Sequence, residues 1–135
     1  MRLANVTRLG FGLLYLLGAL FNTMLAASYP QGYLEVANSA LLPVYKDLWR
    51  VVVAPHLPVL LVLLILFEFS IGVLILSKGL GVKLGLLGGL LFNLFLVPLQ
   101  FVGGMPNLLL AAIQAYLLTK DYRTTILELF RRRSP

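Results

Sequence analysis

The sequence predicts an all-α membrane protein, a polytopic four-helix bundle whose N- and C-termini both lie in the cytoplasm. Three observations support this prediction. Of the 135 residues, 60% are hydrophobic and 12% are charged, against about 45–50% and about 25% in soluble domains. Apolar segments recur four times along the chain, three of them near the ~20 residues that cross a bilayer. The basic residues gather in alternate connections between these segments.

The first predicted span covers about residues 9–27 of a single membrane domain, residues 1–135. Arg2 and Arg8 form a basic start, and Ala26-Ala27-Ser28 resembles a cleavage region, so a signal peptide is the alternative interpretation. Because the apolar stretch is long for a signal peptide, we expect an uncleaved helix.

Residues 28–56 form the longest polar segment, which we assign to the first external loop. Leu41, Tyr45, Leu48 and Val52 recur at roughly helical spacing, which predicts a short amphipathic helix lying at the interface. Tyrosine and tryptophan side chains in this loop suit headgroup depth, and two prolines divide it into pieces.

Three further spans follow, at about residues 57–77, 84–102 and 107–119. A tight basic turn separates the second span from the third, and Pro98 is expected to kink the third. Gly103, Gly104 and Pro106 predict an uncharged turn before the fourth span. That span is short, and the alternatives are that it ends near residue 119 or continues as a helix to residue 130 at the inner surface.

The basic residues predict the orientation in the membrane. In a four-span arrangement one side carries nine of the eleven basic residues, and the other side carries only Lys46 and Arg50. The Lys/Arg excess marks the cytoplasmic side, so we expect a protein of the inner membrane with both termini in the cytoplasm. The basic charge is assigned to the lipid surface, because no basic-aromatic patch for nucleic acid is visible.

The composition also limits the chemistry. The chain contains no cysteine, which excludes disulfides and thiolate metal sites. A single histidine makes a metal site unexpected, and no nucleotide-binding motif is visible.

Glu68 is the sharpest functional signal in the sequence. It lies near the centre of the second span among apolar residues, where a carboxylate costs about 2.5–3.5 kcal/mol even on insertion-based scales. Such a group faces the protein interior or a water-filled cavity, or is protonated. Two interpretations stay open, a proton-active or ligand-binding carboxyl and a buried structural carboxyl bonded to a neighbouring helix.

Neutral polar side chains lie at similar depth in the other spans. Asn93 is at the middle of the third span and Gln114 lies well inside the fourth. Polar residues also repeat at seven-residue spacing, which places each pair on one helical face. The pairs are Tyr15 with Asn22, Asn93 with Gln100, and Asn107 with Gln114. These residues are candidates for a ligand site, and interhelical hydrogen bonds worth about 0.6 kcal/mol each are the alternative.

Two further groups are expected to have packing or surface roles. Gly81, Gly85 and Gly89 follow one another at fourfold spacing, and Gly72 lies one turn beyond Glu68. Small residues let helices approach closely, so we expect packing, with a dimer face as the alternative. Near the outer mouth, Trp49, Arg50 and His56 could bind an anionic or quinone headgroup or could anchor the chain at the interface.

The chain from Tyr29 to Pro98 resembles the DoxX family, including its DoxD and MauE relatives. The resemblance rests on residues 30–33 (PQGY), residues 42–45 (LPVY) and residues 67–72 (FEFSIG), followed by a basic glycine turn. It implies a four-helix bundle linked to a redox system, such as thiosulfate:quinone oxidoreductase or partners of oxidative-stress proteins. Within the motif, Glu68 and Gly72 are the positions that carry over.

These observations lead to one main functional hypothesis. We expect an accessory membrane subunit without stand-alone activity that binds quinone or lipid in a cavity containing Glu68, Asn93 and Gln114, and that has a membrane or peripheral redox protein as its partner. One alternative is a membrane enzyme with Glu68 as general acid or base on a lipophilic substrate. Another is a small transporter or channel assembled as a homo-oligomer through the glycine face.

Overall fold

The computed structural model describes residues 2–99 and 101–132, and it is helical throughout, with no strand in those ranges. Four helices form its body: α1 (Leu3–Ser28), α4 (Leu57–Leu76), α5 (Leu80–Leu96) and α6 (Phe101–Leu118). Three segments, Leu3–Ser28, Pro43–Leu76 and Leu80–Leu99, are long and apolar enough to cross a membrane. The predicted all-α fold is therefore confirmed, and these three segments make the structure consistent with a helical membrane protein. The fourth apolar helix, Gly104–Leu118, is shorter.

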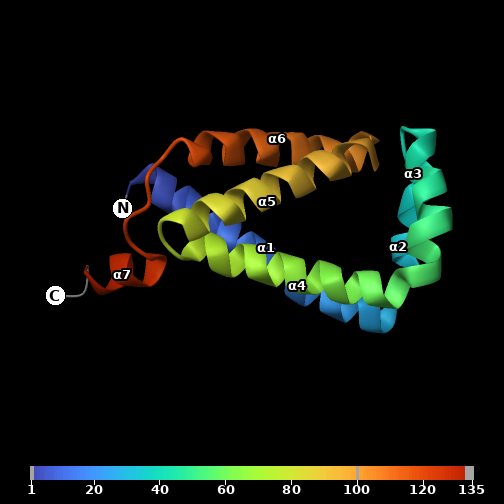
Figure 1. Cartoon of the computed structure of the whole chain (residues 1–135), viewed down its shortest axis with the longest axis horizontal. Coiled ribbons are helices and arrows are strands. Elements are labelled where there is room, and N and C mark those ends of the chain that lie inside the picture. Colours follow the sequence, from blue (N-terminus) through green and yellow to red (C-terminus); the bar gives the residue numbers. More distant parts are fainter. Residues whose placement is uncertain (1, 100, 133–135) are drawn as a thin grey trace.

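The four helices pack as two connected pairs. Helix α4 packs against both α1 and α5, and α5 packs against α6. In Figure 1 the α1–α4 pair and the α5–α6 pair diverge toward the end where α3 stands across the molecule, away from the N- and C-termini. A tight turn at Gly79 joins α4 to α5, and its φ of 59° is a conformation that glycine adopts readily.

Glycines allow the helices to approach closely. An added Cβ at Gly72 would lie 2.8 Å from Leu16 Cγ and 3.0 Å from the Gly12 carbonyl oxygen, where α4 meets α1. At Gly85 it would lie 2.9 Å from the Ile75 backbone nitrogen, where α5 meets α4. The glycine face of the third span therefore packs at Gly85 inside this chain rather than on its outer surface.

The loop between α1 and α4 consists of several short helices instead of one amphipathic helix. They are α2 (Gly32–Glu35), η1 (Val36–Ser39), α3 (Pro43–Leu48), the π-helical turn η2 (Trp49–Val53) and η3 (Ala54–His56). Pro43 begins α3 and Pro55 lies in η3, because proline suits a first turn and interrupts a helix interior. The Tyr45 hydroxyl donates to the Phe95 carbonyl (2.7 Å), which ties this loop to the end of α5.

Two predicted boundaries in the second half of the chain are wrong. The third helix ends at Leu96 and is followed by the 3₁₀ turn η4 (Val97–Leu99), because Pro98 has no backbone N–H to continue the α-helix. The predicted turn at residues 103–106 is part of α6, which contains Pro106. Apolar surroundings favour a backbone that bonds to itself, and this outweighs the turn preference of glycine and proline.

The fourth helix follows the alternative that ends near residue 119 and does not continue to residue 130. It ends at Leu118, and a separate helix, α7 (Ile126–Arg131), follows. A capping box begins α7, in which the Thr125 hydroxyl accepts from the Glu128 backbone N–H and the Thr125 N–H donates to the Glu128 carboxylate. This reciprocal bonding satisfies the first N–H groups of a new helix and explains the break.

Candidate functional site

The helices border a partly open apolar cavity of about 490 Å³ with Glu68 in its wall, and we call it the Glu68 cavity. Helices α4 and α5, the loop helices and one residue of α1 contribute its lining. Leucine, valine and phenylalanine side chains make up most of the wall, and the residues with polar groups are Asn22, Tyr33, Trp49 and Glu68. Ligand sites in proteins typically have about 300–1,000 Å³ and a few polar groups in an apolar wall, so the cavity has the dimensions of a small-molecule site.

One oxygen of the Glu68 carboxyl accepts a hydrogen bond from the protein and the other does not. Glu68 is 8% exposed, and its Oε2 accepts a hydrogen bond of 2.6 Å from Asn22 Nδ2. Oε1 accepts no hydrogen bond from the described residues. It is nevertheless not one of their fully buried side-chain atoms that lack a partner. Gly18 faces this oxygen, since an added Cβ would lie 3.2 Å from Oε1. The carboxyl therefore keeps one oxygen available to a group in the cavity.

Tyr33 forms a hydrogen bond with the Asn22 amide, which in turn bonds Glu68. Its hydroxyl donates to Asn22 Oδ1 at 2.6 Å, which leaves Asn22 Nδ2 directed at Glu68. Burial, together with the nearby Glu68, raises the pKa of Tyr33 above its ordinary value, so the hydroxyl stays protonated. The Tyr33 carbonyl in turn accepts from Trp49 Nε1 at 2.7 Å. A continuous chain of hydrogen bonds thus runs from the loop helices to Glu68.

Asn93 and Gln114 lie in a separate polar cluster. Asn93 Nδ2 donates to Gln114 Oε1 (2.7 Å) and to the Tyr15 hydroxyl (3.0 Å), and Gln114 Nε2 also donates to Tyr15 (3.0 Å). All three are buried, and none lines the Glu68 cavity. The structure thus does not join them to Glu68 in one cavity; they connect α5, α6 and α1 by hydrogen bonds, as the alternative interpretation held.

Of the three residues predicted near the outer mouth, only Trp49 lines the Glu68 cavity, and Arg50 and His56 do not. The exposed Arg50 pairs with Asp47 at 2.9 Å, and the exposed His56 ring lies 2.9 Å from the carbonyl of Val52. Gln100 lies outside the described residues. No cluster of metal-ligating side chains occurs within residues 2–99 and 101–132.

Sequence reasoning missed the role of Tyr33. It was assigned only to the interface and to the PQGY segment, and the structure brings it into the Glu68 chain through Asn22. The signal that could have found it is the position of PQGY immediately after the first span, where a loop residue can fold back on the end of that helix.

The fold and the cavity define a class: a helical protein with candidate membrane-spanning helices around a carboxyl-bearing apolar cavity. No known family model, curated protein or solved structure matches this chain.

Proposed function

We propose that this protein is an integral membrane protein that binds a lipophilic molecule, quinone or lipid, in the Glu68 cavity. In this proposal α1, α4, α5 and α6 cross the inner membrane with both termini in the cytoplasm, as the distribution of basic residues favours. The resemblance to the DoxX family supports a role as accessory subunit of a membrane redox system.

The single observation that carries this proposal is the free Oε1 of Glu68 in an otherwise apolar cavity. A polar group in such surroundings is costly unless it is hydrogen-bonded. A ligand with an apolar body and one polar group would cover the walls and bond this oxygen. A neutral carboxyl can both donate and accept, so it suits the carbonyl of a quinone, the hydroxyl of a quinol and the glycerol hydroxyl of a lipid.

The cavity favours binding over catalysis. Catalysis on a lipophilic substrate needs a second polarising group beside the general acid or base. The amides of Asn93 and Gln114 could polarise a substrate, but both are bonded to Tyr15 outside the cavity.

Mass spectrometry of the purified protein tests the proposal. Wild type in mild detergent should contain a stoichiometric lipophile, and Glu68→Gln should reduce its content. Leu64→Trp, which fills the cavity, should also remove it. Leu63→Trp is the matched control, because Leu63 lies on the same helix, is 54% exposed and does not line the cavity.

Two results would contradict the proposal. One is a wild-type protein that contains no lipophile and takes up none when quinone or lipid is added. The other is a ligand that both Glu68→Gln and Leu64→Trp retain as wild type does, since it would have to bind elsewhere.

A further inference from the structure

A large basic cavity lies at the other end of the molecule, beside the N-terminus. It has a volume of about 900 Å³ and is formed by the start of α1, the connection between α6 and α7, and α7 itself. Its lining contains four cationic side chains, Arg2, Lys120, Arg123 and Arg132, and one acidic side chain, Asp121. We call it the basic cavity; it shares no lining residue with the Glu68 cavity.

Within the described residues, none of the cations that line the basic cavity forms an ion pair with a carboxylate. The two ion pairs in the described part of the chain are Arg50 with Asp47 and Lys78 with Glu128, and neither includes a cation of this lining. Lys120 Nζ lies 4.5 Å from the centre of the Tyr116 ring, a contact that leaves its charge uncompensated. Four cationic side chains and one acidic side chain give this cavity a net positive charge, which attracts anions.

Arg8 adds a fifth positive charge beneath this surface. Its guanidinium is fully buried and donates to the carbonyls of Ser77 (3.4 Å) and Thr124 (3.1 Å). It also lies 4.8 Å from the centre of the Tyr122 ring. Because all these partners are uncharged, Arg8 raises the positive potential around it.

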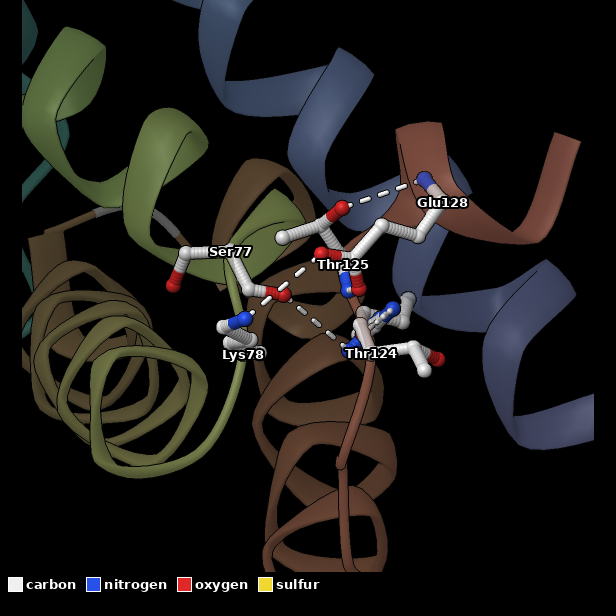
Figure 2. Close-up of polar contacts among 6 residues, drawn as sticks. Ser77, Lys78, Thr124, Thr125 and Glu128 are labelled. Atoms are coloured by element: carbon white, nitrogen blue, oxygen red, sulfur yellow. Dashed lines mark hydrogen bonds and ion pairs between the residues drawn. The ribbon is translucent and has the colours of Figure 1, made fainter. Parts of the chain in front are cut away.

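Hydrogen bonds to neighbouring segments hold the backbone in the wall of the basic cavity. Thr124 is held by Arg8, the Tyr122 carbonyl accepts from the Gly79 N–H at 2.6 Å, and Lys83 bonds the carbonyls of Leu118 and Lys120. In Figure 2 Ser77, Lys78, Thr124, Thr125 and Glu128 converge where α4, the connection before α7 and α7 meet. A wall held by such bonds lowers the entropy cost of binding.

We infer that the basic cavity binds a phosphate group, and that its source is the headgroup of an anionic phospholipid. Guanidinium groups match phosphate geometry through paired N–H donors. The exposed apolar side chains of Leu3 (77%) and Leu127 (73%) lie on the same two helices that form the cavity, α1 and α7. Such side chains suit the boundary between headgroups and acyl chains, where a phosphate is adjacent.

The inference is tested by lipid titration of the full chain in maltoside detergent, read by native mass spectrometry. Phosphatidylglycerol should bind with a preference over phosphatidylcholine that weakens with salt. The double variant Arg123→Gln/Arg132→Gln should bind phosphatidylglycerol about thirtyfold more weakly, from about 1 kcal/mol per basic residue and tenfold per 1.4 kcal/mol. Both residues are exposed, so the variant should keep the wild-type melting temperature without lipid.

Lys46→Gln/Arg50→Gln is the matched control, because it removes the same charge from the loop helices at the other end and should bind as wild type does. Inorganic phosphate identifies the source of the phosphate group. Competition at millimolar concentration would assign the site to a free phosphate compound, and its absence would assign it to the lipid. Equal lipid binding by wild type and the double variant, or equal losses in both double variants, would overturn the inference. Glu68→Gln should leave this binding unchanged, which separates this site from the one proposed above.

Discussion

Replacing Gly85 by alanine should weaken the packing of α5 against α4. The new Cβ would lie 2.9 Å from the Ile75 backbone nitrogen and 3.0 Å from Leu74 Cβ, where ordinary contacts begin at 3.4 Å. The helices must therefore separate by about 0.5 Å (3.4 − 2.9), since a backbone atom cannot turn aside. A gap of about 0.5–1 Å already forfeits a quarter to a half of each dispersion contact, and overpacking of this kind costs about 1–3 kcal/mol.

Gly10 supplies the matched control, because an added Cβ there meets nothing within 4 Å. Both substitutions place alanine within a helix, where it is favoured over glycine by up to about 1 kcal/mol. Gly10→Ala should therefore be neutral or stabilising, and Gly85→Ala should be less stable than Gly10→Ala by about 1–3 kcal/mol. Unfolding by SDS in mixed micelles, followed by circular dichroism, measures the difference. Equal stability of the two variants would refute the close approach of α5 to α4.

Three further predictions concern other parts of the molecule. Tyr33→Phe should reduce ligand retention less than Glu68→Gln does, because it frees the Asn22 amide but keeps the carboxyl. Tyr29→Phe, at an exposed tyrosine bonded to Glu35, is its control in the same mass-spectrometric assay, and equal retention by both variants would contradict the Tyr33 chain. Gln114→Leu should cost about 1–2 kcal/mol in SDS unfolding, because it leaves buried polar partners with fewer bonds. Gln114→Leu should leave the ligand content unchanged, and loss of the ligand would show that the cluster of Tyr15, Asn93 and Gln114 belongs to the binding site. The Thr125 N–H bond and then Lys78 lower the pKa of Glu128 below its ordinary value. This stabilisation of α7 is therefore present above the unfolded pKa of the carboxyl and is lost as the pH falls through the lower folded pKa. Hydrogen exchange of residues 126–131, corrected for intrinsic rates, should rise over that acidic range in wild type and stay flat in Glu128→Gln.

Much of the fold could be predicted from the sequence because hydropathy is a local property. Helices α1 and α4 contain the long apolar segments that hydropathy identifies, and the Lys78–Gly79 turn follows from its composition. The start of α6 could not be predicted in this way. Gly103, Gly104 and Pro106 favour a turn in water, whereas apolar surroundings favour a helix that satisfies its own backbone.

The sequence was enough to predict Glu68 as the central residue of the candidate site, but not which residues bond to it. The burial of Glu68 follows from one charge within an apolar helix. Its partner depends on how the neighbouring helices are rotated, and depth alone favours Asn93 and Gln114. Asn22 is the partner in the structure because α1 packs directly along α4, and because Tyr33, in the loop beyond α1, forms a hydrogen bond with the Asn22 amide. Neither fact is encoded in the spacing of polar residues along one helix.

The two polar clusters have complementary roles along α1. Tyr15 bonds α5 and α6, whereas Asn22, about two turns further along and so ~10 Å away, bonds Glu68. The two helix pairs, α1–α4 and α5–α6, diverge toward α3 (Figure 1). Asn93 belongs to the closed cluster, while its neighbour Phe92 lines the Glu68 cavity. The hydrogen bonds among Tyr15, Asn93 and Gln114 therefore connect three helices outside the cavity, whereas the Asn22 bond holds the Glu68 carboxyl in the cavity wall, where a lipophilic ligand would bind in the proposed function.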